Sequence, residues 1–275
     1  MTPEPTLFAS PSRNIGGEPR GAGVKLRLRR GLHALLRAAL RLRSQPYRPA
    51  AGPDPVTLVI APHPDDDVLG CGGLVARKRL DGLRIHVVYL TDGGASHCGH
   101  PGLTPANLVP QRQAEARSGL RVLGVDSAET TFLGVADGTL DHLAPAAAAA
   151  LVTRLAELLD GVRPDEILLP CRRDGSSEHE AAFRLVRRAA DATGRRFRWL
   201  EYPVWAWWSP RLLARVLLTS RRVWRREFAG YVPVKREALT RHRSQLEPTP
   251  PWTRPVLSPA FVAFFLQPVE YFFES

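Results

Sequence analysis

The stretch VTLVIAPHPDDDVLGCGGLVARKRLDGLRIHVVYLT, residues 56–91, decides the fold of this chain. It begins with the β-branched apolar run of residues 56–61 and ends with a second apolar run, residues 84–91, and both are typical of buried strands. We expect a helix over residues 68–79 between them. A strand, a helix and a second strand in this order indicate a β-α-β unit with parallel strands.

The same alternation continues toward the C-terminus. We expect further strands over residues 130–133 and 166–170, and helices over residues 111–123, 144–159 and 179–191. Strands that alternate with helices predict a mostly parallel sheet with helices on both faces. The predicted fold class is therefore α/β, with a Rossmann-like sheet in a single domain over residues 54–275.

The composition is that of a globular protein. The chain has 275 residues, of which 44% are hydrophobic and 24% are charged, and this balance excludes a wholly disordered chain. Its three cysteines, Cys71, Cys98 and Cys171, are odd in number and far apart, so a disulfide scaffold is not expected. A reducing compartment is the simpler interpretation, and we expect a cytoplasmic protein.

The excess of positive charge is concentrated at the N-terminus. Lys and Arg outnumber Asp and Glu by 38 to 27 in the whole chain, but by ten to two within residues 1–53. Leucines recur at helical spacing among the arginines of residues 21–43, which predicts a basic amphipathic helix in an N-terminal arm that ends at residue 53. Arginines interrupt every apolar run of this arm, so neither a secretory signal nor a membrane span is expected.

Two interpretations of the arm stay open. It either attaches the protein to an acidic partner or to anionic lipid at the inner face of a membrane, or it is a solvated helix on its own domain or a partly disordered extension. Nucleic acid is not the expected partner, because the other residues carry 28 basic against 25 acidic side chains and predict no basic face.

Metal-binding residue types follow two of the expected strands. The segment APHPDDDVLGCGG, residues 61–73, places His63 and three consecutive aspartates after the first strand, and CRRDGSSEHEAAF, residues 171–183, places His179 after a later one. Parallel strands end at the same edge of a sheet, so these two loops are expected to converge. Clustered carboxylates are costly to bury without a cation, and His with oxygen donors suits zinc, iron or another transition metal. These residue types predict a metal site with three protein ligands and an open position for water.

Helix capping offers a different explanation of the same residues. Aspartates after a strand often begin a helix, and Ser177 with Glu180 fits an S-x-x-E capping box. Because both loops are expected at one sheet edge, we favour the metal site.

The motifs together resemble those of the PIG-L/LmbE-type zinc de-N-acetylases. The resemblance rests on APHPDDDVLGCGG, VVYLTDG, QRQAEARSGLRVLGV, FLGVADG, DGSSEH and LTRHRSQ, which run in order from about residue 56 to the C-terminus. It implies a Rossmann-like α/β fold and hydrolysis of an N-acetyl group, usually from an acetylated amino sugar. It also implies one zinc ion per chain, with the family's metal ligands mapping to His63, Asp66 and His179 and its general base to Asp65.

The resemblance further implies which residues contact the substrate. These are Arg112, Asp137 and His242. For two of them a structural explanation also stays open, because Arg112 fits an ordinary surface ion pair with Glu115, one helical turn away, and Asp137 fits a turn before Gly138.

The chain departs from the family pattern at two positions. Asp67 stands where the family motif usually has Glu, and Ser176 stands where the family often has the first His of an H-x-x-H pair. That His is assigned to oxyanion stabilisation or acid catalysis, and loss of one oxyanion donor costs on the order of a hundredfold in rate. His242, His97 and His100 are available as substitutes.

Two other segments carry residues that suggest a function. SHCGH, residues 96–100, holds three potential metal ligands, His97, Cys98 and His100; a second metal site there is one interpretation, and a substrate loop is the one we expect. The aromatic runs of residues 204–208 and 261–273 are expected to pack in the core or to form a lid. If the second run is exposed, it and the arm form one membrane-facing surface.

The resulting expectation is a zinc-dependent hydrolase that removes the N-acetyl group of an amino sugar or glycoconjugate. The substrate is expected to be a small molecule or a lipid-linked sugar. Two alternatives remain: an accessory protein that binds metal and ligand but catalyses poorly, and a protein whose basic arm attaches it to a membrane or to nucleic acid.

Overall fold

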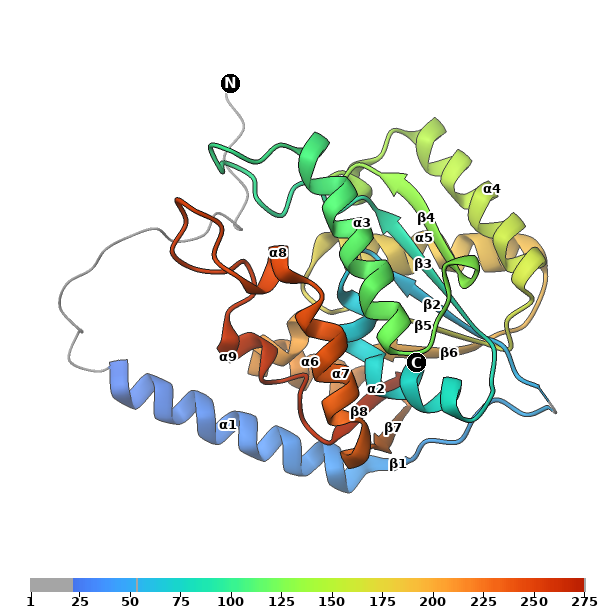
Figure 1. Ribbon diagram of the computed structural model, residues 1–275. Helices are drawn as coiled ribbons and strands as arrows, with labels where there is room; N and C mark the ends of the chain where they lie inside the picture. Colours follow the sequence, from blue (N-terminus) through green and yellow to red (C-terminus); the bar gives the residue numbers. More distant parts are fainter. Residues whose placement is uncertain (1–21, 53, 275) are drawn as a thin grey trace.

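The computed structural model describes residues 22–52 and 54–274. At its centre lies an eight-stranded sheet with the strand order β1-β7-β8-β6-β5-β2-β3-β4 (Figure 1). The strands are β1 Ser44–Pro46, β2 Thr57–Ala61, β3 Ile85–Thr91, β4 Thr130–Val135, β5 Glu166–Pro170, β6 Arg198–Tyr202, β7 Arg222–Glu227 and β8 Val269–Glu274. All neighbouring strands are parallel except β8, which runs antiparallel to both β6 and β7.

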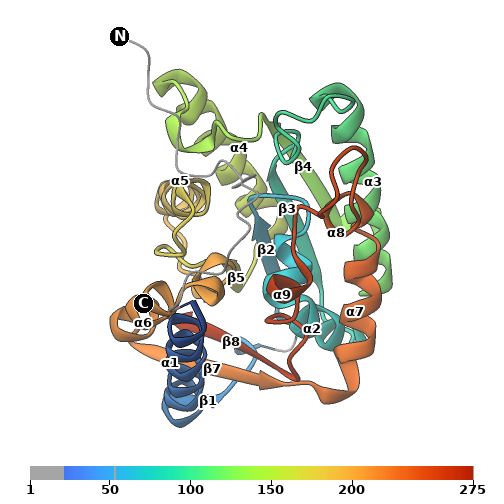
Figure 2. The ribbon, with the colours of Figure 1, turned by 90° about the vertical axis from the view of Figure 1, so that its left-hand side faces the viewer.

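Helices cover both faces of this sheet (Figure 2). Helices α4 and α5 lie over one face, and α2, α3 and α7 lie over the other. The helices are α1 Ala22–Arg43, α2 Asp66–Leu80, α3 Pro105–Val122, α4 Pro145–Val162, α5 Ser177–Thr193, α6 Pro210–Thr219, α7 Val232–Thr240, α8 Arg243–Leu246 and α9 Pro259–Val262. Short 3-10 turns are η1 Ser127–Glu129, η2 Leu140–His142, η3 Trp205–Trp208 and η4 Ala229–Tyr231. The described residues therefore form the predicted α/β fold with a mostly parallel sheet.

The central strand shows why both faces must be covered. Every residue of β2 is buried. Because successive side chains of a strand point to opposite faces, Leu58 and Ile60 pack in the core under α4 and α5, whereas Val59 and Ala61 pack in the core under α2 and α3. The uninterrupted apolar run that predicted this strand is thus the sequence of a strand with two buried faces.

The predicted elements are present, and some begin earlier than expected. The strand at residues 166–170 has the predicted bounds, whereas α3 begins at Pro105, six residues before the predicted start. Thr104 and Asn107 form a reciprocal capping box there, and proline is favourable at the first helical position. At α5 the cap is Ser176, whose Oγ accepts from the backbone N–H of His179, and not the predicted Ser177.

The described part of the basic segment is joined to the domain. Arg43 at the end of α1 donates to the carbonyls of Leu217 and Ser220 at 2.7 and 3.2 Å, at the C-terminal end of α6, where carbonyls lack helical partners. β1 pairs with β7, and Tyr47 donates from its buried hydroxyl to Glu166 at 2.8 Å. The arm predicted over residues 1–53 is thus part of the domain from α1 onward, and residues 1–21 lie outside the described part of the chain.

The C-terminal aromatic run completes the sheet. β8 lies between β6 and β7, and its Phe272 and Phe273 are fully buried, as expected for core packing. α2 approaches the sheet closely because Gly70 faces the Tyr202 ring, which a Cβ at residue 70 would overlap at 2.1 Å. No described helix has the length and the apolar composition that a bilayer span needs.

Candidate active site

The candidate site lies where the order of the strands changes direction. β2 stands between β5 and β3, and from this point the chain builds the sheet outward to β4 on one side and to β6 on the other. The loops that follow β2 and β5 lead to α2 and α5 on opposite faces of the sheet. The region between these loops at the carboxyl ends of the strands, which we call the crevice, is the usual ligand position in such sheets. His63 lies on the first loop, and His179 lies in the first turn of α5 after the second.

Three predicted metal ligands meet in this crevice. Oδ2 of Asp66 lies 3.0 Å from Nδ1 of His63 and 3.3 Å from Nε2 of His179. One donor atom from each of the three residues lies within 4.8 Å of the others. The convergence expected from the sequence is therefore present in the structure.

The outer nitrogen of His179 is held by a carboxylate. Nδ1 of His179 lies 2.7 Å from Oδ2 of Asp174, and Asp174 also accepts the backbone N–H groups of Val204, Trp205 and Ala206. This contact directs Nε2 toward Asp66, where it is buried and forms no well-aligned hydrogen bond with a described residue. A buried nitrogen lone pair beside a carboxylate and a second imidazole fits a transition-metal ligand, and this donor set suits zinc.

A second pair of carboxylates surrounds the other side of His63. Nε2 of His63 lies 2.9 Å from Oε2 of Glu178 and 3.3 Å from Oδ1 of Asp137. The backbone N–H groups of Gly138 and Leu140 donate to the other oxygen of Glu178, each at 3.0 Å. His63 is thus fixed on both ring nitrogens, with Nδ1 toward Asp66 and Nε2 toward Glu178.

The proposed general base pairs with an arginine. Nη2 of Arg112 donates to Oδ2 of Asp65 at 3.0 Å, and Nη1 donates to the carbonyl of Gly93 at 2.9 Å. Both charged side chains are buried. Gly93 has φ +69°, and a Cβ at this position would lie 2.5 Å from the guanidinium, so glycine is required beside Arg112. Arg112 is thus not the surface ion-pair residue that its spacing from Glu115 also allowed.

The charges of the site are strongly coupled. Burial raises the pKa of Asp65, and this effect exceeds the opposing effect of Arg112. Burial also acts to raise the pKa of Asp66, but His179 and His63 hold it well below its usual range. Burial opposes the charged form of His179, yet its contacts with Asp66 and Asp174 raise its pKa to about 9. In the protein alone, the buried carboxylates and the imidazoles thus stabilise each other's charged forms, and a bound cation would take over this role from the imidazole protons.

The two departures from the family pattern have structural roles. Ser176 caps α5, so its hydroxyl serves the helix N-terminus. Asp67 is fully buried, and burial raises its pKa to about 7, although a contact with Tyr89 opposes this shift. Asp67 is therefore not accessible to a substrate at the surface of the site.

The predicted substitutes for the missing His are not among the three converging donors. His242 is 1% exposed and packs against Gly119 of α3, and burial lowers its pKa to about 4. His97 stacks on Trp252 with ring centroids 5.4 Å apart, and His100 contacts the carbonyls of residues 249 and 250. Within residues 22–52 and 54–274, the groups of three metal-ligand side chains all include His63, and none includes SHCGH.

Two residues of the site were missed by the sequence analysis. Asp174 and Glu178 lie within the DGSSEH motif, yet only His179 of that motif received a role. Their signal is weak in the sequence, because acidic residues before and within the first turn of a helix are ordinary helix-stabilising features. Only the contacts with His179 and His63 show that they orient the candidate ligands.

The fold and the site together define an α/β protein with a Rossmann-like, mostly parallel sheet and a candidate metal site at the strand switch point. Residues 58–190 match the PIG-L family, described as GlcNAc-PI de-N-acetylase. That part of the chain, slightly less than half of its length, is similar to this family of deacetylases, as the motifs predicted.

Similar proteins agree with this assignment. The chain is 36% identical over 86 residues to the "Uncharacterized deacetylase YaiS" of Escherichia coli K12, which covers 31% of this chain and 40% of that relative. This chain thus aligns with less than half of the length of the curated relative.

Solved structures share the fold. The conserved protein TT1542 of Thermus thermophilus is 27% identical, with a TM-score of 0.56 over 76% of this chain and 83% of that chain. The N,N'-diacetylchitobiose deacetylase of Pyrococcus horikoshii is 20% identical, with a TM-score of 0.52 over 78% of this chain and 79% of that chain. At this low identity, the second likeness concerns the fold alone.

Proposed function

We propose that this protein is a zinc-dependent hydrolase that removes the N-acetyl group of an amino sugar or glycoconjugate. The observation that carries this proposal is the position of Asp65 beside the converging His63, Asp66 and His179. The match of residues 58–190 to a deacetylase family supports the same reaction. A crevice with three ligands and an adjacent carboxylate is the arrangement that metal-assisted amide hydrolysis needs.

His63, Asp66 and His179 would hold the zinc ion. A bound zinc ion lowers the pKa of water toward neutrality and polarises the amide carbonyl. Asp174 and Glu178 each contact the outer ring nitrogen of one imidazole. These contacts orient the two rings so that Nε2 of His179 and Nδ1 of His63 face Asp66, and they favour the proton on the outer nitrogen. These carboxylates therefore act as positioning residues.

Asp65 moves the proton in this reaction. It accepts a proton from the attacking water as the water oxygen bonds to the carbonyl carbon, and it returns the proton to nitrogen as the C–N bond breaks. The products are the free amine and acetic acid, so the atoms balance. Arg112 occupies Oδ2 of Asp65, which directs proton transfer to Oδ1.

The substrate contacts are proposed from the same crevice. Asp137 lies beside His63, with Oδ2 held by the backbone N–H of Ala95 and Oδ1 3.3 Å from Nε2 of His63, and a sugar hydroxyl would donate to Oδ1. Arg112 would orient the acetyl group through its contact with Asp65. His242, the third predicted substrate contact, would act on the substrate from a buried position against Gly119 of α3. A free and a lipid-linked sugar both remain within this substrate class, and the unpaired state of the three cysteines supports a cytoplasmic location.

Release of free amine from a panel of N-acetylated amino sugars tests the proposal. We expect activity for zinc-loaded wild type, loss of both zinc and activity for His63→Ala, and retained zinc with activity at least a hundredfold lower for Asp65→Asn. Asp160→Asn, which replaces an exposed carboxylate near the C-terminal end of α4, is the matched control and should keep full activity. Equal activity of Asp65→Asn and wild type would refute the role of Asp65.

One observation favours the accessory-protein alternative. Ser176 is committed to helix capping, and no histidine stands at that position. Zinc binding that depends on His63, without amine release from any member of a broad panel, would support this alternative.

A further inference from the structure

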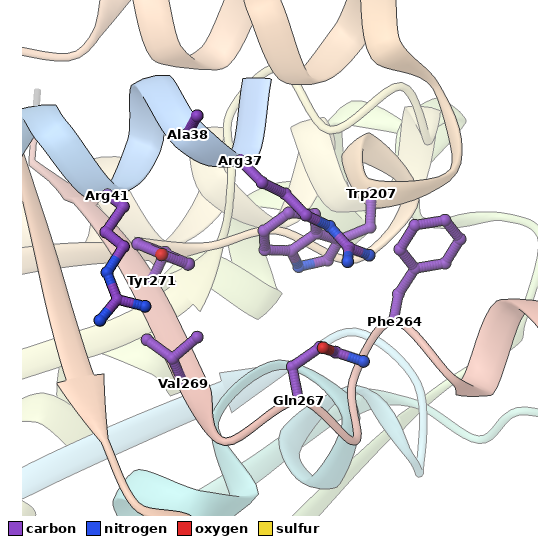
Figure 3. A pocket seen from close by; sticks show the side chains of 8 residues that line it. All are labelled: Arg37, Ala38, Arg41, Trp207, Phe264, Gln267, Val269 and Tyr271. Carbon is purple, nitrogen blue, oxygen red and sulfur yellow. The ribbon is translucent and has the colours of Figure 1, made fainter. Parts of the chain in front are cut away.

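A cavity lies between α1 and the C-terminal part of the chain, away from the candidate active site (Figure 3). It has a volume of about 240 Å³. Arg37 and Arg41 of α1 form one side, and apolar or aromatic side chains form the others, namely Trp207, Phe264, Val269 and Tyr271. Two cations above an apolar floor fit a ligand with an anionic head and an apolar body.

Neither arginine is neutralised within the fold. The guanidinium of Arg37 lies 5.4 Å from the centre of the Phe264 ring, and it forms no ion pair among the described residues. Arg41 reaches Glu227 only at 3.9 Å, where both side chains are more than half exposed, and such pairs contribute little. Both cations are therefore available to an external anion.

The outer face of α1 beside the cavity carries exposed leucines. Leu35 is 69% exposed and Leu42 is 87% exposed, and their seven-residue spacing places them on one stripe of the helix with Leu32. Leu218 of the neighbouring α6 is 79% exposed. Large apolar side chains gathered on adjacent helices indicate a surface that binds an apolar partner.

The same region has a strong excess of positive charge. Residues 31–52 and 209–227, which form α1 and β1 and α6 and β7, contain ten arginines and one acidic residue, Glu227. Exposed leucines interspersed with arginines are typical of helices that lie in the interface of an anionic membrane. A second copy of this chain would bring like charges together, and nucleic acid offers no partner for the leucines.

We propose that this surface docks on an anionic lipid bilayer, with a lipid phosphate between Arg37 and Arg41 in the cavity. The leucine stripe of α1 enters the acyl region, and the surrounding arginines contact neighbouring headgroups. The described part of α1 thus serves two partners, the sheet through its inner face and the membrane through its outer face.

The docking surface is connected to the candidate active site through η3. Trp207 of η3 lines the cavity, and the backbone N–H of Trp205 in the same turn donates to Asp174, which holds His179. A bilayer at this surface therefore lies beside an element of the site.

Sedimentation of the full chain with vesicles tests the proposal. The vesicles contain phosphatidylcholine alone or with phosphatidylglycerol as the anionic component. We expect the wild-type protein to bind the anionic vesicles. Arg37→Gln/Arg41→Gln should weaken this binding at least tenfold, and Leu35→Gln/Leu42→Gln should weaken it as well. Arg184→Gln/Arg188→Gln on α5 and Leu80→Gln at the end of α2 replace exposed side chains elsewhere in the fold, and these controls should bind as wild type.

Each contrary result has a definite meaning. If the α5 control loses vesicle binding to the same degree, net charge alone attracts the protein to the vesicles. If Leu35→Gln/Leu42→Gln binds vesicles as tightly as wild type, the leucines do not insert into the bilayer. Competition by inorganic phosphate without vesicle binding would assign the cavity to a free anion. A dimer in solution that Leu35→Gln/Leu42→Gln dissociates, or binding to a DNA duplex in place of vesicles, would also overturn the proposal. Asp65→Asn should bind vesicles as wild type, so failure of membrane docking and failure of deacetylation are distinguishable.

Discussion

Glu178 joins His63 to the loop that carries Asp137. Its Oε2 lies 2.9 Å from Nε2 of His63, while its Oε1 accepts the backbone N–H groups of Gly138 and Leu140. One carboxylate thus orients a candidate metal ligand and fixes the loop of a candidate substrate contact. The first turn of α5 therefore supplies both His179 and the group that positions His63.

Replacement of Glu178 should weaken metal binding. The amide of Glu178→Gln has one acceptor oxygen, so it cannot serve both His63 and the backbone of residues 138 and 140. We expect a 10- to 100-fold lower affinity for zinc, the usual effect of losing a carboxylate behind a ligating histidine. Titration with zinc against a competing chelator measures it. Glu180→Gln, on the same helical turn but outside the cluster, should leave the affinity unchanged, and a loss of similar size there would contradict the assigned role.

Ser176→His separates capping from catalysis. Ser176 accepts the N–H of His179 as the cap of α5, so its replacement should lower the free energy of unfolding by about 1 kcal/mol. Ser176→Ala should show the same loss of stability without a catalytic group, whereas Ser176→Asp keeps a capping side chain. Under the proposed function, the histidine variant should release amine faster than the alanine variant. Denaturant unfolding and initial rates measure the two effects, and equal rates for both variants would show that residue 176 does not contribute a catalytic donor.

His242 should make the folded state less stable in acid. Burial lowers its pKa from the ordinary 6.5 to about 4, so the unfolded chain takes up the proton at a higher pH than the folded chain. The stability that neutral, buried His242 gives the folded state is fully present above pH 6.5. It is lost as pH falls toward 4, which lowers the free energy of unfolding by on the order of 3 kcal/mol. His242→Gln removes the titrating group. The difference in unfolding free energy between variant and wild type should therefore change between pH 7.5 and pH 4.5, and a constant difference would contradict the shift.

Lys235 and Glu270 form a buried ion pair inside the fold. Nζ of Lys235 donates to Glu270 at 2.7 Å and to the carbonyl of Leu69 at 2.8 Å, while Glu270 accepts the N–H groups of Gly73 and Leu74 in α2. Lys235→Met leaves the carboxylate buried without its cation and should lower the unfolding free energy by about 3–5 kcal/mol. Arg236→Met, the exposed neighbour, should change it by less than about 0.5 kcal/mol. A small effect at Lys235, measured by denaturant unfolding, would mean that solvent reaches Glu270.

The sequence determined the β-α-β unit and the convergence of His63 and His179. An apolar run such as residues 56–61 has to be buried on both faces, and parallel strands with this pattern end at one edge of the sheet. The metal-ligand types that follow two of these strands were therefore placed together without knowledge of the side-chain contacts. The family motifs added the distinct roles proposed for Asp65 and Asp66.

Only the tertiary structure decided which groups stand behind these residues. Asp174 and Glu178 gain their roles from the imidazole nitrogens that they meet, and such contacts depend on how α5 and the loop after β4 pack, which no local spacing encodes. The sequence also did not determine what the basic segment packs against, because an amphipathic helix with arginines suits both a membrane and the surface of its own domain. The carbonyls at the end of α6 and the edge of β7 fix its inner face, and this packing leaves the leucines of its outer face exposed.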